Sequence, residues 1–295
     1  MKVKHFNNKK YMGKTGKLGL MAAFVIGLCA TCMACYASKD VKQENTKMIE
    51  VDRNVGYFSR IESTTSADIV YEQGKSSKVR IVGNKDLVDN LVVERNGEKL
   101  VLKSRRRMGN VVNFSFDNGV RRQLTVYVTS PDLTEVVIGG SGDFMAHTDI
   151  DSDVFTLSSN GSADITLRNV VCDNFKIGVR GSGDIKAQTI DCRSASVEIH
   201  GSGDAEIGCL KSDAAELSVM GSGDVDATLR GVANTLLSVN GSGDMDVTFD
   251  NCGTADCRLH GSGDIELKGS LGSLTRSKAG SGDIDIEELR LTRKR

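Results

Sequence analysis

The amino-acid sequence predicts an all-β chain wound as a right-handed, single-stranded parallel β-helix with coils of about 20 residues. First, the motif Gly-Ser-Gly-Asp, with one alanine variant at its third place, recurs eight times, at steps of 21, 20, 20, 20, 20, 20 and 19 residues. Second, apolar and polar residues alternate on both sides of each motif, which is typical of strands with one buried face. Third, a constant period stacks each residue on its equivalent in the next coil, so apolar residues form continuous columns. The motifs begin at Gly140, Gly161, Gly181, Gly201, Gly221, Gly241, Gly261 and Gly280.

Other arrangements of strands fit the repeat less well. A series of hairpins would not need a constant period, and a β-α-β unit needs a crossover of a dozen or more residues. The right-handed sense follows the general rule for parallel crossovers. The glycines are expected at tight corners, where a positive φ is required.

The first 37 residues have the pattern of an export signal. They carry six lysines and no acidic residue, and residues 18–34 are mostly apolar but short for a membrane span, which needs roughly 20 residues. The sequence Cys32-Met33-Ala34-Cys35 resembles a lipoprotein cleavage site, although leucine is usual where Cys32 stands. Lipidation at Cys35, ordinary cleavage and an uncleaved anchor all remain open, and each places the mature protein outside the cytoplasm.

The rest of the chain divides by composition and pattern. Residues 38–47 are expected to be a linker, and residues 48–139 an N-terminal β region, built as irregular coils or as a β cap over the open end of the solenoid. Residues 140–290 form the predicted repeat solenoid, and residues 291–295 a frayed tail. Within the N-terminal region, Asn96-Gly97 is a hairpin signal, and Ser66-Ala67-Asp68 looks like a degenerate copy of the motif.

The repeat region is acidic. Residues 140–290 contain 12 basic and 25 acidic side chains, a net charge of −13, whereas the whole chain has a formal net charge of −1. This disfavours nucleic acid as a partner.

One aspartate of each motif is expected to stack on the next, giving a row of carboxylates along one corner. Like charges about 4.8 Å apart repel by roughly 1 to 3 kcal/mol at a surface dielectric, so something must offset the repulsion. Capping of backbone amides at the turn is one interpretation, and a row of calcium sites is the other. No cofactor other than this calcium is expected. The row is Asp143, Asp164, Asp184, Asp204, Asp224, Asp244, Asp264 and Asp283.

The sequence does not predict an enzyme. Carbohydrate-active β-helix enzymes need two or three carboxylates at one special place, whereas these repeat uniformly. All five tyrosines precede the repeats and tryptophan is absent, so the aromatic platforms typical of sugar sites are missing from the repeats.

Three smaller groups of residues each have two interpretations. Cys172 and Cys192 occupy equivalent places in adjacent coils and are either stacked free thiols or a disulfide. The histidines are expected to face solvent and lie too far apart to share a metal. An arginine cluster is either a solvated hairpin face or a contact for anionic polymer or lipid. The last two groups are His147, His200 and His260, and Arg105, Arg106, Arg107, Arg121 and Arg122.

Two short sequences and the repeats resemble a known family. Phe58-Ser59-Arg60-Ile61, then Ser66-Ala67-Asp68-Ile69, then serial Gly-Ser-Gly-Asp units are similar to the "putative auto-transporter adhesin, head GIN domain" family over about residues 48–290. The resemblance implies a β-helical fold, an exported or lipid-anchored envelope protein of a Gram-negative bacterium, and an adhesive role. It supplies no catalytic residues.

The sequence thus predicts a non-catalytic, exported cell-envelope protein that binds a surface through its repeats. A periplasmic or outer-membrane scaffold without an external ligand is the first alternative, and a carbohydrate-active enzyme the second. The expected partner is a cell-surface or envelope polymer or protein of unknown identity, with membrane attachment through a lipid anchor as an open alternative.

Overall fold

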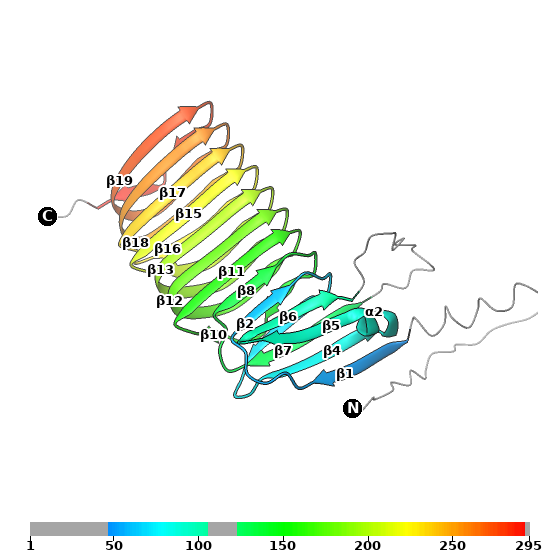
Figure 1. Ribbon diagram of the computed structural model, residues 1–295. Coiled ribbons are helices and arrows are strands. Elements are labelled where there is room, and N and C mark those ends of the chain that lie inside the picture. The colour runs from blue at the N-terminus through cyan, green and yellow to red at the C-terminus, as the bar shows by residue number, and fades with distance from the viewer. Residues whose placement is uncertain (1–46, 106–122, 293–295) are drawn as a thin grey trace, which may run out of the picture.

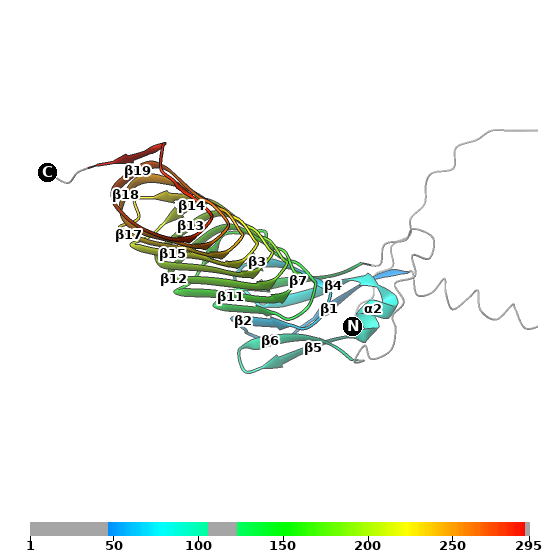
Figure 2. The ribbon, with the colours of Figure 1, turned by 90° about the horizontal axis from the view of Figure 1, so that it is seen from above.

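The computed structural model describes residues 47–105 and 123–292, which form a stack of β coils with a small cap at its N-terminal end (Figure 1). Figure 2, viewed from above, shows the coils overlying one another along the stack. All the strands belong to one hydrogen-bonded system, and the pairing throughout the repeat region is parallel. The predicted all-β solenoid is therefore confirmed, while its right-handed sense stays a prediction.

The strands of the repeat region run between the motif corners. They are β11 (Val154–Gly161), β12 (Ile165–Gly181), β13 (Ile185–Gly201), β14 (Ala205–Lys211), β15 (Ala214–Gly221), β16 (Val225–Arg230), β17 (Asn234–Gly241), β18 (Met245–Gly261), β19 (Ile265–Gly280), β20 (Ile284–Asp285) and β21 (Leu289–Leu291).

Residues 20 apart lie beside each other in neighbouring coils. Ile185 pairs with Ala205, and Ala205 pairs in turn with Val225. The match between the sequence period and the strand register superimposes the coils, so every inward-facing residue meets its equivalent above and below.

The interior consists of the apolar columns that this register creates. Ile177, Val197 and Leu217 are fully buried members of one column, and Phe155 and Phe175 stack with ring centroids 5.8 Å apart. Each buried aliphatic or aromatic side chain contributes about 1.5–3 kcal/mol. A single coil encloses little by itself, so the stacking of coils provides the stability.

The first coil of the solenoid lies within the N-terminal region, at the degenerate motif Ser66-Ala67-Asp68. Strands β2 (Arg60–Ser63) and β3 (Asp68–Gln73) flank this corner. They pair in parallel with the two sides of the next coil, β8 (Glu135–Ile138) and β9 (Phe144–Ala146), which is followed by β10 (Ile150–Asp151). The corner of the second coil is the first full motif.

The cap is inserted between β3 and β8. Its elements are β4 (Lys78–Asn84), α2 (Lys85–Asn90), β5 (Leu91–Asn96), β6 (Lys99–Ser104) and β7 (Leu124–Ser130), together with β1 (Met48–Arg53) from before the first coil. Strand β6 pairs in parallel with β2, and β7 pairs in parallel with β3, so the cap continues both sides of the first coil. Beyond them β5, β4 and β1 add antiparallel strands, with the predicted turn at Asn96-Gly97 between β5 and β6. The cap therefore joins the first coil through parallel pairs and continues outward through antiparallel ones.

The motif glycines have two different roles, which corrects the explanation based on positive φ alone. Gly221 has a φ of 141°, as expected for a corner glycine. Gly223 has no positive φ, yet a Cβ atom there would lie 1.9 Å from the carbonyl oxygen of Gly203 in the preceding coil. A Cβ atom at Gly221 would likewise lie 2.1 Å from the carbonyl oxygen of Gly201, so close approach of stacked backbones acts at both glycines and is the only one of the two reasons that applies to the second.

Candidate functional site

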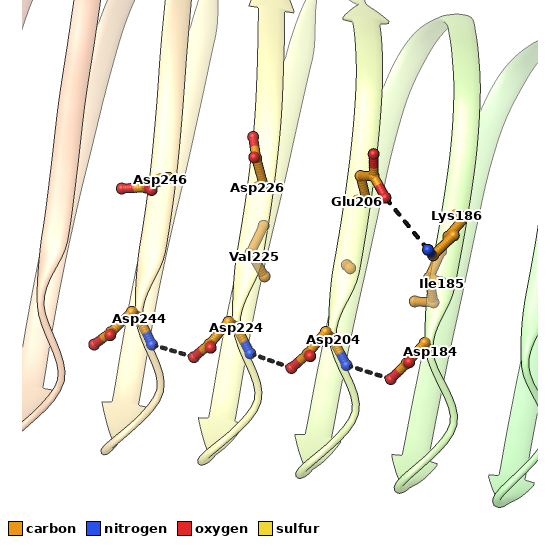
Figure 3. A pocket seen from close by; sticks show the side chains of 11 residues that line it. Asp184, Ile185, Lys186, Asp204, Glu206, Asp224, Val225, Asp226, Asp244 and Asp246 are labelled. Carbon is orange, nitrogen blue, oxygen red and sulfur yellow. Dashed lines mark hydrogen bonds and ion pairs between the residues drawn. The ribbon is translucent and has the colours of Figure 1, made fainter.

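The motif aspartates form one row along an outer corner of the solenoid (Figure 3). Each aspartate follows a Gly-Ser-Gly corner and precedes a buried residue, so the alternation of a strand turns its carboxylate outward. Asp204, Asp224 and Asp244 are all exposed. The structure therefore brings together the predicted row of carboxylates.

Each aspartate accepts a hydrogen bond from the backbone of the next coil. The N–H of Asp224 donates to Oδ1 of Asp204 at 2.9 Å, and the N–H of Asp244 donates to Oδ1 of Asp224 at 2.8 Å. The series begins at Asp68, whose Oδ1 accepts from the N–H of Asp143, and continues to Asp283. This is the geometry of the turn-capping interpretation, in which backbone dipoles offset the repulsion between carboxylates.

The pKa of one member of this row, Asp143, is raised. Burial raises the pKa of Asp143 above its usual value, and the negative charges of Asp164 and Asp68 raise it further. The hydrogen bond from the Asp164 N–H acts in the opposite direction. The amide caps thus offset part, but not all, of the cost of a charged carboxylate at this position.

A second acidic row runs beside the first, two residues further along each coil. Glu206 pairs with Asp226, Asp226 with Asp246, and Asp246 with Glu266, so four carboxylates are neighbours in register. We predicted only that this position would be polar and outward-facing. The signal for an acidic row was present in the sequence, as carboxylates recurring at one fixed offset from the motif.

The two rows line a groove with a volume of about 430 Å³. Figure 3 shows its carboxylates and the single lysine among them, Lys186, whose Nζ lies 3.6 Å from Glu206 Oε2. Beyond the groove, Lys268 Nζ lies 2.8 Å from Glu266 Oε1. Asp226 and Asp246, in the middle of the row, have carboxylates as register neighbours on both sides.

The middle of the second row carries unfavourable charge. The pKa of Asp246 is raised, first by burial and then by the charge of Glu266 and a hydrogen bond with it. A proton or a cationic group would relieve this repulsion. The groove is therefore the part of the solenoid best suited to attract a positively charged ligand.

The predicted calcium row has weaker support from the geometry. Calcium takes 6–8 oxygen ligands, and one oxygen of each corner aspartate already accepts a backbone N–H. Within residues 47–105 and 123–292, no group of three or more histidine, cysteine or acidic side chains is placed to hold a metal ion. Calcium binding stays a prediction, and the groove is where it would have to occur.

Cys172 and Cys192 are register partners in β12 and β13, and both are buried free thiols. A hydrogen bond between the two side chains lowers the pKa of Cys172 and raises that of Cys192, which keeps its proton. The structure thus brings the predicted pair side by side, and the disulfide itself stays a prediction.

The remaining candidate residues are scattered or outside the described residues. His200 and His260 belong to one outward row, separated by Met220 and Asn240, and His147 lies near the first motif. Arg105 is exposed at the end of β6, and its backbone N–H donates to the Asn90 carbonyl. The other members of the arginine cluster, Arg106, Arg107, Arg121 and Arg122, and the lipidation candidate Cys35 lie outside the described residues.

Solved structures share this architecture. A "putative adhesin" from Parabacteroides merdae matches with a TM-score of 0.68 and 17% identity, covering 82% of this chain and 97% of that one. A "putative adhesin" from Bacteroides fragilis matches with a TM-score of 0.58 and 25% identity, covering 81% and 96%. A "putative lipid binding protein" from Parabacteroides distasonis has a TM-score of 0.64 and 23% identity, covering 81% and 96%. The likeness to the first and third of these concerns the fold alone.

No curated protein matches the chain. In the part of the chain that the structure describes, no helix is long and apolar enough to cross a membrane. A family model described as "Putative auto-transporter adhesin, head GIN domain" matches residues 57–234 and 232–293, which cover the first coil, the cap apart from β1, and all the repeats. The chain therefore belongs to this family.

Proposed function

We propose that this chain is a non-catalytic, exported protein of the Gram-negative cell envelope whose solenoid adheres to another surface through many weak contacts. The observation that carries the proposal is the registered repetition of outward-facing side chains. Because neighbouring coils stack residue on residue, a row such as Glu206, Asp226 and Asp246 presents similar groups at equal intervals. Many equal contacts along a rigid body add up to avidity even when each one is weak.

The uniform carboxylates support a binding role over a catalytic one. Acid–base catalysis needs one group whose surroundings distinguish it from its neighbours, usually opposed by a second group across the substrate. The corner aspartates instead share the same neighbours and the same backbone hydrogen bond from coil to coil. The adhesin family points in the same direction.

Export is supported by the first 37 residues, with six lysines ahead of an apolar run. Lipidation at Cys35, ordinary cleavage and an uncleaved anchor stay open. The proposed ligand is a cell-surface or envelope polymer or protein, and the charge of the solenoid indicates its chemistry. The net charge of −13 in residues 140–290 favours a ligand with cationic or hydrogen-bond-donating groups.

Binding of the purified, labelled chain to bacterial cells, animal cells and a glycan array tests the proposal. The matched variants lack one coil (residues 201–220) or two coils (residues 201–240), and both deletions preserve the register. Adhesion by repetition predicts that the apparent affinity falls stepwise with each coil removed. Folding of each variant is checked by circular dichroism.

Two outcomes would contradict the proposal. Failure to bind any of these surfaces would favour the structural scaffold, which needs no external ligand. Turnover of a polysaccharide that disappears when one single aspartate is changed to asparagine would show that the chain is an enzyme.

A further inference from the structure

The last coil has an uncovered strand edge. Residues 273–280 of β19 pair in parallel with β18 of the preceding coil, with Cys257 opposite Arg276 and Leu259 opposite Lys278. Strands β20 and β21 pair only with the first part of β19, up to Leu271. Within the described residues, nothing pairs with the outer side of residues 273–280, at the red end of the stack in Figure 1.

An uncovered edge of this kind is ready to pair with another strand. Its backbone N–H and C=O groups point along the axis of the solenoid, as they do in every inner coil where the next coil accepts them. At the other end of the molecule, β6 and β7 continue both sides of the first coil. Strands therefore cover both sides of the first coil, whereas part of the last coil has no described strand on its outer side.

Two charged residues replace the apolar columns at this edge. The inward position of Arg276 holds only fully buried apolar residues in the coils before it, including Leu217, Leu237 and Cys257. The position of Lys278 likewise holds Val219, Val239 and Leu259, all buried. In the last coil, both Arg276 and Lys278 are exposed.

The ammonium group of Lys278 also ends the aspartate row. In each inner coil, Oδ1 of the corner aspartate accepts the backbone N–H of the next coil, as Asp264 does from Asp283 at 2.7 Å. Oδ1 of Asp283 accepts instead from Lys278 Nζ at 2.6 Å. One lysine thus interrupts an apolar column and supplies the donor that a further coil would have supplied.

We propose that Arg276 and Lys278 act as a stop that prevents a second copy of this chain from pairing with the free edge of the last coil. A second copy is the natural partner, because its own last coil presents the same edge and the same columns. Two such edges would meet through a two-fold axis, which brings the four cationic side chains together and buries them with only the two Asp283 carboxylates as partners. The cost of that burial keeps the edge open to solvent.

Replacing both charges tests the stop. We expect Arg276→Leu/Lys278→Leu to restore the apolar columns and to form a concentration-dependent dimer in sedimentation velocity, whereas the unsubstituted chain does not associate through this end. A closed dimer is expected, because the two-fold contact uses up both free edges. The matched control is Thr275→Leu/Ser277→Leu, which adds the same apolar groups to the outward face of the same strand and should sediment like the unsubstituted chain.

The result that overturns the proposal is a folded Leu/Leu variant that sediments like the unsubstituted chain at every concentration. If the Leu/Leu variant does not fold, the proposal is tested with Arg276→Gln/Lys278→Gln, because this variant removes the charges and keeps the side chains polar. Association of the Gln/Gln variant at a lower concentration than the unsubstituted chain supports the stop, and unchanged sedimentation refutes it. The Asp283 ion pair is checked by Lys278→Gln alone, which should lower the melting temperature while Thr275→Gln does not.

Discussion

At the scale of single residues, each position of the Gly-Ser-Gly-Asp motif answers one need of the corner. The first glycine provides a positive φ, and the second allows one backbone to lie against the next. The serine N–H donates to the carbonyl of the first glycine in the preceding coil, as Ser222 does to Gly201 at 2.9 Å. The aspartate then supplies the acceptor for an amide that no backbone carbonyl reaches. The motif is therefore explained by the architecture before any ligand is considered.

For the stability of the aspartate row, we expect the hydrogen-bond acceptor and the shape of the side chain to matter more than its negative charge. Asp224→Ala leaves the Asp244 N–H without its acceptor and should lower the free energy of unfolding by about 1 kcal/mol. Asp224→Asn keeps a carbonyl oxygen at the same place and removes repulsion with Asp204 and Asp244, so its stability should equal or exceed that of the unsubstituted chain. Urea unfolding monitored by circular dichroism compares the three. Equal loss of stability in both variants would mean that the negative charge itself is required.

At the scale of strands and coils, the outer rows have contrasting electrostatics. Some rows alternate in sign, so that Arg193 pairs with Asp173 at 3.1 Å and Lys211 with Asp191 at 3.8 Å across neighbouring coils. The second acidic row instead places like charges next to one another, and the raised pKa of Asp246 records the cost. A chain selected for stability alone would not keep such a row, which supports the view that the groove has a role in binding.

The raised pKa of Asp246 determines whether its contribution to folding stability rises or falls with pH. Because its folded pKa lies above the ordinary value of 3.8, the folded state binds the proton more tightly than the unfolded state. The resulting stabilisation is fully present below pH 3.8 and is lost as the pH rises through the folded pKa. Asp246→Asn should therefore stabilise the protein at pH 7 by roughly 0.5 kcal/mol and have less effect near pH 4.

Thermal melts at both pH values measure this difference. The control is Asp173→Asn, which removes a partner of Arg193 and should give no stabilisation at pH 7. A difference between Asp246→Asn and the unsubstituted chain that stays constant from pH 4 to pH 7 would contradict the assignment of the repulsion to this residue.

The sequence predicted best those features of the fold that follow from the 20-residue repeat. The coil length, the apolar columns and the outward aspartate row all follow from residues that recur every 20 positions. The cap could not be derived in this way, because its strands between β3 and β8 carry no repeat and their partners are decided by the two free sides of the first coil. The close approach at Gly223 was also missed, since a sequence shows that glycine is present but not which backbone lies against it. Arg276 and Lys278 break two apolar columns in the sequence, but only the structure shows that no described strand pairs with the outer side of this part of β19.

At the scale of the whole molecule, each coil contacts mainly its two neighbouring coils. The free energy of unfolding is therefore approximately a sum of similar contributions from the coils and from the interfaces between neighbours. The coils share one interior, and in residues 154–280 the strands of each coil pair with strands of the adjacent coils. The N-terminal cap and the charged C-terminal edge then define where this sum begins and ends.

This modularity predicts the outcome of coil removal. Deletion of residues 201–220 joins His200 to Gly221 and brings Ile185 opposite Val225, so we expect a folded protein with unchanged circular dichroism per residue. Deletion of residues 201–210 removes half a coil and places corner glycines opposite strand residues, which breaks every column beyond the cut. Limited proteolysis should leave the first variant intact and cleave the second. Equal resistance in both would show that the columns do not determine the pairing.

The insertion of the cap between β3 and β8 affects how the nascent chain can fold. Until β8 and β9 have been synthesised, the native partners available to β2 and β3 are β6 and β7, so we expect the cap and the first coil to fold first. From Phe144 onward, each further segment of about 20 residues can pair with the coil formed before it. This pairing closes only a short loop and forms a full set of backbone hydrogen bonds. We therefore expect the coils to form in order from the amino end toward the carboxyl end during synthesis.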